Sequence, residues 1–252
     1  MRVVLTRPVH EAERWAARLR EHGFDSLVLP LLAIAPAPDA AALRQATAGA
    51  GRYAALMFVS ANAVQAFFGA APVALHQARA WAPGPATQEA LLAAGVAPER
   101  ITAPAADAEQ FDSESLWQQV QGQLRAGDRL LLVRGGDGQG RAQGRDWLLQ
   151  QLEARGVAVD TVVAYTRAAL SWSEAQRAAA RQAAGDGSLW LFSSSEAASQ
   201  LALLLPGQDW SRGQALATHP RIAAAVRAVG FGNVRATRPG WDDVLASIES
   251  PR

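Results

Sequence analysis

The chain contains the same succession of motifs twice, in the same order. Each copy begins with a short apolar run that ends in arginine, followed by a serine-containing turn and then by a proline-containing turn that opens a helix pattern. The spacing between the copies grows after the first pair, which indicates an insertion within residues 135–144. A duplicated α/β unit that faces its copy forms a cleft, where small ligands usually bind. The matched pairs are residues 2–7 with 129–134, 58–63 with 192–197, and 84–87 with 219–222.

The composition excludes several kinds of enzyme chemistry. All 24 Lys+Arg residues are arginine, so no lysine is present for a Schiff base, a P-loop or a general base. The absence of cysteine excludes disulfides, thiolate nucleophiles and cysteine metal sites. Arginine does not lose its proton, but its planar fork binds carboxylate and phosphate.

Charge and hydropathy narrow the class of protein further. Half of the residues are hydrophobic and 19% are charged, as in a folded globular protein. The apolar runs are too short to cross a bilayer and residues 1–10 have a strand pattern without a signal peptide, so we expect a cytoplasmic protein with no membrane partner. A net charge of +1 gives no field that would attract nucleic acid. No metal is expected, since the histidines lack the spacing of a metal site. They are His10, His22, His76 and His219.

Strand and helix patterns alternate along the chain. This alternation predicts an α/β fold with parallel sheets covered on both faces. We expect strands at residues 2–6, 53–59, 79–82, near 101, 129–134, 157–166, 188–192, 214–217 and 233–236. We expect helices at residues 9–22, 39–48, 62–70, 86–94, 113–124, 145–155, 173–184, 195–205, 220–229 and 241–249.

Two extended runs are longer than an ordinary strand of about 5–6 residues. The first covers residues 27–36 and contains Pro30, and the second covers residues 157–168. A proline inside such a run is typical of an edge or irregular strand. Each run can pass from one domain to the other. We therefore expect two similar parallel-sheet α/β domains joined by a pair of extended crossing strands.

Four turns between a strand and a helix are candidate binding sites, because ligands of parallel sheets bind beyond the carboxyl ends of the strands. The free N–H groups and positive dipole of a helix N-terminus attract anions. Helix capping is the alternative explanation, and Ser193 with Glu196 three residues later fits a capping box. The paired recurrence of the turns favours a ligand with several carboxylates. The candidates are Ser60, Asn62, Gly84, Thr87, Ser193, Ser194, Ser195 and Arg221.

Several other polar residues have two possible roles. Arg7 and Arg134 follow matching strands, where they can contact a ligand in a cleft or form a surface salt bridge. Tyr165, late in the second long run, can donate a proton in a cleft or pack with a bonded hydroxyl. Tyr53 is expected to pack in the core. The glycine-rich residues 135–140 fit neither dinucleotide nor Walker motifs, so we expect a flexible surface connection there.

Taken in order along nearly the whole chain, these motifs resemble those of the uroporphyrinogen-III synthase family. No single motif is strong, because members of the family are divergent, and the ordered set supports the resemblance. The motifs are LTRP at 5–8, FVSANAV at 58–64, GPAT at 84–87, FDSE at 111–114, LVRG at 132–135, YTR at 165–167 and FSSSEA at 192–197.

The resemblance implies two α/β domains, with the substrate cleft between them. Domain 1 would comprise residues 1–36 and 169–252, and domain 2 residues 37–168. The implied activity is that of a cyclising hydro-lyase. It converts linear hydroxymethylbilane into uroporphyrinogen III, with inversion of ring D through a spiro intermediate and loss of water. No metal or organic cofactor is implied. We further expect a monomer that makes at most transient contacts with neighbouring pathway enzymes.

The resemblance also implies roles for individual residues. Tyr165 matches the family's cleft tyrosine, which assists departure of the hydroxyl as an acid or hydrogen-bond donor. Ser60, Thr87 and Ser194 match polar turn positions that bind substrate carboxylates. The chain departs from the family's Gly-Pro-Thr-Thr turn at residues 219–222, where Arg221 can bind a carboxylate instead. The loop after Arg134 is also longer than the compact form of the family.

A non-catalytic binder of a polycarboxylate or tetrapyrrole is the alternative hypothesis. Such a protein would keep the anion-binding turns but would not need Tyr165. A pair of receiver-type domains is less consistent with the sequence, because such domains use a lysine and the chain has none.

Overall fold

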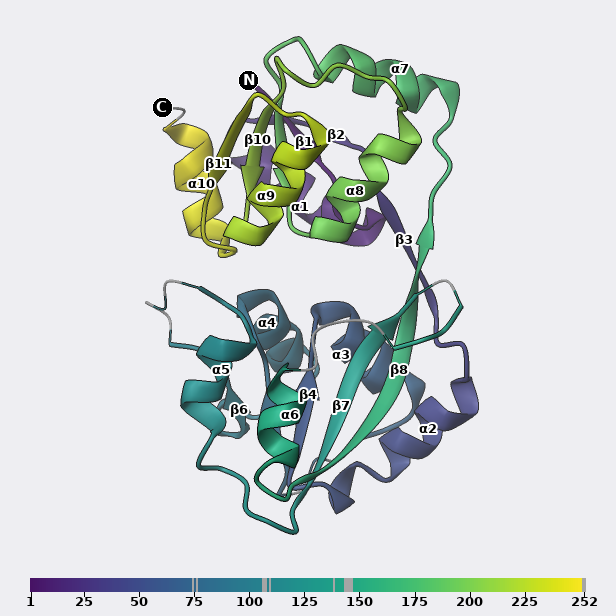
Figure 1. Ribbon diagram of the computed structural model, residues 1–252, viewed down its shortest axis with the longest axis vertical. Coiled ribbons are helices and arrows are strands. Elements are labelled where there is room, and N and C mark those ends of the chain that lie inside the picture. The colour runs from purple at the N-terminus through teal and green to yellow at the C-terminus, as the bar shows by residue number, and fades with distance from the viewer. Residues whose placement is uncertain are drawn as a thin grey trace. The chain divides into compact units, whose positions relative to one another are not determined.

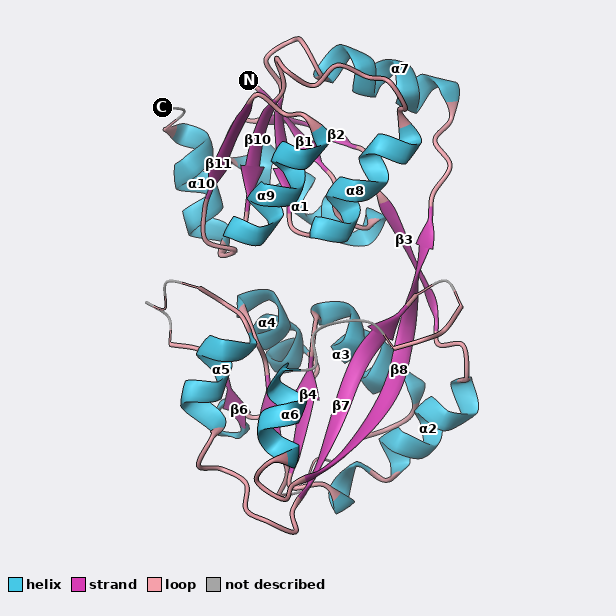
Figure 2. Cartoon of the chain, viewed as in Figure 1, coloured by secondary structure: helices cyan, strands magenta, loops and turns pink. Residues whose placement is uncertain are grey.

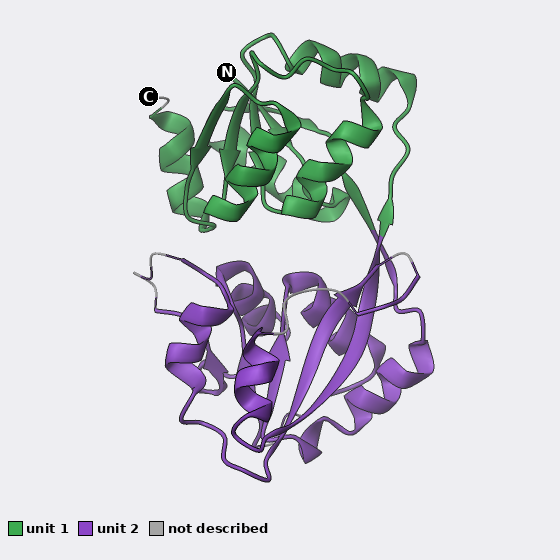
Figure 3. Cartoon of the chain, viewed as in Figure 1, with its two compact units in different colours: residues 1–33, 168–252 green, residues 34–167 purple. Residues whose placement is uncertain are grey.

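A computed structural model of the chain divides into two compact units, which are described separately. Unit 1 comprises residues 1–33 and 168–252, and unit 2 comprises residues 34–167 (Figure 3). The structure describes residues 1–73, 75, 77–105, 108, 110–137, 139–142 and 147–250. His76 and the predicted start of a helix at residue 145 lie outside these ranges.

Unit 1 is a five-stranded parallel sheet with helices on both faces. Its elements are β1 (Arg2–Leu5), α1 (Val9–Glu21), β2 (Asp25–Val28), α7 (Glu174–Ala183), β9 (Leu189–Phe192), α8 (Ser195–Leu204), β10 (Gln214–Ala217), α9 (Pro220–Val229), β11 (Asn233–Ala236) and α10 (Trp241–Glu249). The strands pair in the order β11-β10-β9-β1-β2 (Figure 1). Helices α7, α8 and α9 cover one face, and α1 and α10 cover the other. Helix α1 turns back at Gly23, whose φ is 79°, a conformation that favours glycine.

Unit 2 repeats this layered arrangement (Figure 2). Its elements are α2 (Ala40–Ala48), β4 (Ala55–Phe58), α3 (Ala61–Ala70), β5 (Arg79–Trp81), α4 (Pro85–Ala93), β6 (Ile101–Thr102), α5 (Ser113–Val120), β7 (Arg129–Gly136) and α6 (Trp147–Glu153), with short 3-10 helices at Ala50–Arg52 and Pro98–Arg100. Strands β3 (Leu32–Pro36) and β8 (Ala158–Ala169) lead from one unit into the other along the chain. The sheet order is β3-β8-β7-β4-β5-β6. Helices α2, α3 and α4 cover one face, and α5 and α6 the other. The predicted α/β fold with parallel sheets is confirmed.

The register of the two sheets agrees with the sequence repeat. In unit 1, β1 lies beside β9 with Leu5 opposite Leu191. In unit 2, β7 lies beside β4 with Leu132 opposite Met57. Strands β2, β1, β9, β10 and β11 thus correspond to β8, β7, β4, β5 and β6. Because β1 and β7 come from different copies of the repeat, each unit combines the start of one copy with the end of the other.

The first long extended run is not continuous. The sequence predicts one run over residues 27–36, but the structure has two strands, β2 and β3, separated by residues 29–31. Pro30 lies in this break and its carbonyl accepts a hydrogen bond of 2.9 Å from the Trp172 indole. Each of the two strands lies at the edge of its sheet, as expected beside a proline that cannot donate to a ladder. The second long run forms the continuous β8.

Candidate active site

The N-terminus of α3 is formed as the sequence predicts. Ser60 follows β4, and its hydroxyl accepts a hydrogen bond of 3.2 Å from the Ala63 backbone N–H. Asn62, in the first turn of α3, is half-buried. Capping is therefore one role of Ser60, and the remaining N–H groups of the first turn are suited to an anion.

The N-terminus of α4 follows β5 in the same sheet. Gly84 is the residue before the helix, and Pro85 occupies the first helical position, where a missing N–H costs little. A Cβ on Gly84 would lie 3.6 Å from Phe111 Cβ, an ordinary contact, so space does not require glycine here. Thr87 is only 5% exposed, so its side chain lies mostly within the fold.

Helices α8 and α9 form the corresponding turns in unit 1. The predicted capping box of Ser193 and Glu196 is wrong by one residue, because Ser194 caps α8 and accepts a hydrogen bond of 3.3 Å from the Ala197 N–H. Ser193 and Ser195 flank this cap and are half-exposed. At α9, His219 Nδ1 accepts a hydrogen bond of 3.1 Å from the Arg221 N–H. The Arg221 side chain is exposed, and Pro220 occupies the first helical position as predicted.

Two of the predicted site residues in unit 2, Tyr165 and Ser60, are in direct contact. Their hydroxyl oxygens lie 3.0 Å apart, and either can donate. Tyr165 is 4% exposed and belongs to the core beneath α2, α3 and α4. The guanidinium of Arg167 lies 5.8 Å from the centroid of its ring. The phenol is thus held in one orientation beside the N-terminus of α3.

The two predicted arginines are buried rather than exposed. Arg7 is 7% exposed, and it pairs with Glu11 at 3.4 Å and lies 4.4 Å from the Trp15 ring centroid. Burial lowers the pKa of Arg7, while Glu11 opposes this shift. Arg134 is 5% exposed and lies inside β7, not after it. The surface salt bridge is therefore wrong for Arg7, whose ion pair is buried. Glu11 was missing from the predicted site, although its position four residues after Arg7 is the usual helix pairing distance.

The first part of the glycine-rich segment after Arg134 belongs to a strand and not to the predicted connection. Residues 135 and 136 belong to β7. Asp137 then closes a turn: its carboxylate accepts hydrogen bonds of 2.9 Å each from the backbone N–H groups of residues 139 and 141 and from Arg141 Nε. Residues 138 and 143–146 lie outside the described part of this segment.

Tyr53 packs in the core as predicted and is 4% exposed. Its hydroxyl donates to Asp160 at 2.8 Å and accepts from Arg52 at 3.2 Å. Burial raises the pKa of Tyr53, and the hydrogen bond to Asp160 raises it further. This network lies at the amino ends of the strands, away from the helix N-termini described above.

Among the described residues, no group of three or more His, Cys, Asp or Glu side chains is arranged to hold a metal ion. Within the same ranges, none of the helices has both the length and the apolar character that crossing a bilayer would need.

A comparison with protein families matches residues 13–246 to the family described as uroporphyrinogen-III synthase HemD. The chain belongs to the uroporphyrinogen-III synthase family. Members of this family are cyclising lyases of tetrapyrrole biosynthesis, which act on the linear tetrapyrrole hydroxymethylbilane and form uroporphyrinogen III. The hypothesis of a non-catalytic binder gains no support from the match.

Solved structures share the fold of this uroporphyrinogen-III synthase family member. A mutant uroporphyrinogen III synthase from Thermus thermophilus gives a TM-score of 0.59 at 18% identity, over 99% of this chain and 97% of that chain. The uroporphyrinogen-III synthetase from Helicobacter pylori gives a TM-score of 0.62 at 16% identity, over 100% of both chains. At these identities the likeness is one of fold, and residue roles must come from the chain itself.

Proposed function

We propose that this chain binds the carboxylates of hydroxymethylbilane at the N-termini of α3, α4, α8 and α9, and that Tyr165 assists loss of the substrate hydroxyl. The observation that most supports this proposal is the partly buried hydrogen bond between Tyr165 and Ser60. It orients a phenol beside one of the helix N-termini that are suited to anions.

The substrate has eight carboxylates, so several separate anion sites suit it better than one. In unit 2 the candidates are Ser60, Asn62, Gly84 and Thr87 at two helix N-termini. In unit 1 they are Ser193, Ser194 and Arg221 at two more. Arg7, two residues after β1, and Arg134, within β7, are proposed as further contacts to the substrate. Partial charges at helix N-termini keep their sign at any pH, which favours steady binding of carboxylates.

The role proposed for Tyr165 is to hydrogen-bond the departing hydroxyl. Loss of that hydroxyl as water needs a proton, and a phenol O–H can supply it or stabilise the developing charge. Ser60 can accept from the phenol or donate to it, so the pair can adjust as the charge changes. The activated methylene carbon then bonds the substituted α-carbon of ring D to give the spiro intermediate, and the older bond from that carbon to the bridge with ring C breaks. The freed bridge carbon bonds the unsubstituted α-carbon of ring D, which releases the proton that balances the one given to water.

Most of the rate enhancement is proposed to come from orientation. A linear tetrapyrrole is flexible, and it closes without an enzyme to the type I product. Fixing several of its carboxylates favours the conformation in which closure occurs at the inverted carbon, which is an effect of proximity and orientation. No resident metal or organic cofactor is part of this proposal.

We further propose that the protein works as a cytoplasmic monomer and meets neighbouring pathway enzymes transiently. Rapid transfer would limit spontaneous closure of the substrate before it is bound. Sedimentation at working concentration tests the monomer, and a dimer as the main species would contradict it.

The deciding experiment supplies the purified protein with enzymatically generated hydroxymethylbilane and identifies the uroporphyrinogen isomer. We expect mainly type III. Formation of type I alone, by protein with native circular dichroism, would contradict the proposed activity.

The Tyr165→Phe variant tests the role of the phenol. We expect kcat to fall about 10–100-fold with KM nearly unchanged, which is the effect of one hydrogen bond of about 1.4–3 kcal/mol in the transition state. Tyr53→Phe is the matched control, because it removes the only other tyrosine hydroxyl, which lies at the amino ends of the strands. Equal losses in the two variants would contradict a specific role for Tyr165.

A further inference from the structure

We propose that Gly135 is a positioning residue for Tyr165. The absence of a side chain at residue 135 provides the space through which the Tyr165 ring reaches Ser60. This inference rests on the proposed role of Tyr165 in the reaction, but its geometric part can be tested separately.

Tyr165 and Ser60 do not come from neighbouring strands. The sheet order is β8-β7-β4: Tyr165 lies on β8, and Ser60 directly follows β4. Neighbouring strands are about 4.8 Å apart, so the side chain must span β7 to make its 3.0 Å contact with Ser60. The residue of β7 at this level is Gly135, which pairs with Tyr165 in the β7–β8 ladder. Ser60 is at the same level as Gly135. Phe58 of β4 pairs with Val133 of β7, and Ser60 and Gly135 each come two residues later on their own segment.

A register shift turns Tyr165 toward this face. The ladder pairs Arg134 with Val163 but Gly135 with Tyr165, so Ala164 is an extra residue on β8. Regular alternation would place Ala164 and Tyr165 on opposite faces of the sheet. Instead, both belong to the core beneath α2, α3 and α4. Re-aiming of one side chain is a common effect of a β-bulge.

The ring lies too close to Gly135 for any side chain to be added. A Cβ built on Gly135 would lie 2.6 Å from Tyr165 Cζ, 2.8 Å from its hydroxyl and 2.9 Å from Cε2. Real Cβ atoms essentially never approach other heavy atoms this closely. The φ angle of Gly135 is outside the left-handed region, in contrast to that of Gly140 at 77°. Glycine is therefore needed at residue 135 for space and not for backbone conformation.

The test combines Gly135→Ala with two changes at residue 165. Alone, Gly135→Ala should displace the phenol and lower kcat about as much as Tyr165→Phe does, with KM nearly unchanged. Overpacking should also lower Tm by about 5 °C. In a Tyr165→Ala background the space is already open, so adding Gly135→Ala should change neither Tm nor kcat further.

Gly136→Ala is the matched control. Its Cβ would lie 2.8 Å from Val163 Cγ1, so it crowds the same strand end without meeting the tyrosine. Its loss of Tm should persist in the Tyr165→Ala background.

Two results would overturn the inference. One is a kcat for Gly135→Ala within twofold of the wild type while Tyr165→Phe lowers kcat. The other is an equal loss of Tm for Gly135→Ala in the wild-type and Tyr165→Ala backgrounds.

If Tyr165→Phe itself leaves kcat unchanged, the proposed function of Tyr165 fails, and the Tm comparison alone still decides whether Gly135 provides the space. If Gly135→Ala alone does not fold, recovery of folding in Gly135→Ala/Tyr165→Ala supports the inference, and failure of both overturns it.

Discussion

Units 1 and 2 have corresponding strands in the same order and register, but they differ at the carboxyl ends of the strands. In unit 2, Tyr165 crosses Gly135 to reach Ser60. By the sequence repeat, Ser194 in unit 1 corresponds to Ser60 and Pro8 corresponds to Gly135. Pro8 precedes α1, and its ring includes the Cβ that glycine lacks. The framework and its helix N-termini are thus present twice, whereas the buried phenol is specific to unit 2.

An aromatic cluster is common to the two units. In unit 1, Trp15 of α1 packs edge-to-face on Trp241 of α10, with ring centroids 5.0 Å apart, and the Arg18 guanidinium lies 3.9 Å from the Trp241 centroid. In unit 2, Trp147 of α6 packs on Trp117 of α5 at 6.3 Å, and Arg155 lies 4.5 Å from the Trp117 centroid. Since α1 and α6 follow corresponding strands, the two clusters occupy corresponding faces.

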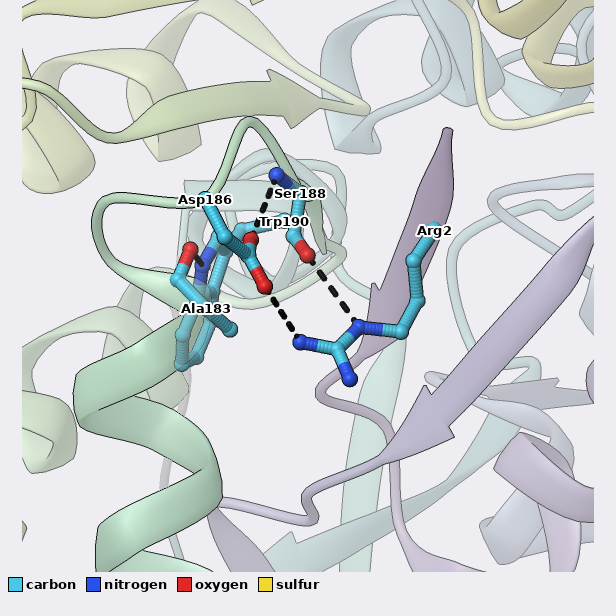
Figure 4. A network of polar contacts seen from close by, with 5 residues as sticks. All are labelled: Arg2, Ala183, Asp186, Ser188 and Trp190. Atoms are coloured by element: carbon cyan, nitrogen blue, oxygen red, sulfur yellow. Dashed lines mark hydrogen bonds and ion pairs between the residues drawn. The ribbon is translucent and has the colours of Figure 1, made fainter.

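The two units have different ion pairs at the amino ends of their strands. Arg2 and Arg129 begin corresponding strands. Arg2 donates to Asp186 at 2.7 Å and to Ser188 at 3.2 Å (Figure 4). Arg129 instead pairs with Asp160 of β8, which also accepts a hydrogen bond from Tyr53. The arginine is repeated, while its partner comes from a different element in each unit.

The largest expected effect concerns the aromatic clusters. Trp15→Ala and Trp147→Ala should each lower the free energy of unfolding by about 2 kcal/mol, because each removes a half-buried indole and an aromatic pair. Urea denaturation measures the loss in free energy of unfolding, and hydrogen exchange of backbone amides shows which unit has lost stability. A loss for one variant that exceeds the other by more than about 1 kcal/mol would break the equivalence of the clusters.

A smaller effect is expected at the serine caps. Ser60→Ala and Ser194→Ala should each cost about 1 kcal/mol of stability, the usual value of an N-cap. Steady-state kinetics should separate them, because only Ser60 contacts Tyr165. Both serines are proposed carboxylate sites, so both variants should raise KM, and only Ser60→Ala should also lower kcat. The comparison fails if Ser194→Ala lowers kcat as much as Ser60→Ala does.

The smallest effect on stability is expected for the ion pairs at the amino ends of the strands. Hydrogen bonding from Tyr53, with Arg129, lowers the pKa of Asp160 against opposing desolvation. Burial acts to raise the pKa of Asp186, but hydrogen bonds from Ser188 and the charge of Arg2 outweigh it and lower that pKa. A lowered carboxyl pKa stabilises the fold above the ordinary value of 3.8, and this contribution disappears as the pH falls through the folded-state pKa.

Asp160→Asn and Asp186→Asn should therefore each cost under about 1 kcal/mol at pH 7, because water screens these partly exposed pairs. The differences in urea midpoint between each variant and the wild type should shrink as the pH falls from 7 through 3.8 toward the folded-state pKa. A difference that stays constant with pH would show that the charge of the aspartate is not responsible.

Much of the fold was predictable because its elements are local in sequence. The periodic patterns place most strands and helices close to their observed bounds, and the repeat predicts which strands correspond. Less was predictable where tertiary contacts decide. The run at 27–36 is broken at Pro30, whose carbonyl accepts a hydrogen bond from Trp172 of a distant segment, and α5 ends at Val120, earlier than its pattern predicts.

The local geometry of the helix N-termini was predictable, but the contacts between separate elements were not. The capping positions at Ser60 and the proline positions in α4 and α9 follow from local chemistry. The contact between Tyr165 and Ser60 depends on a register shift between Arg134 and Gly135, which the alternation of apolar residues does not predict. The adjacent glycines at 135 and 136 were the available signal, since glycine inside a strand often marks a bulge or a close approach of another group.

The exchange of repeat segments between the units has a consequence for the order of folding. All strands of unit 2 are present once residue 169 has been synthesised. By then unit 1 has only β1 and β2, and the other edge of β1 waits for β9, which begins at Leu189. An unpaired apolar edge favours aggregation while it lasts. Premature termination after residue 169 would therefore leave a nearly complete unit 2 attached to an exposed, aggregation-prone two-stranded fragment.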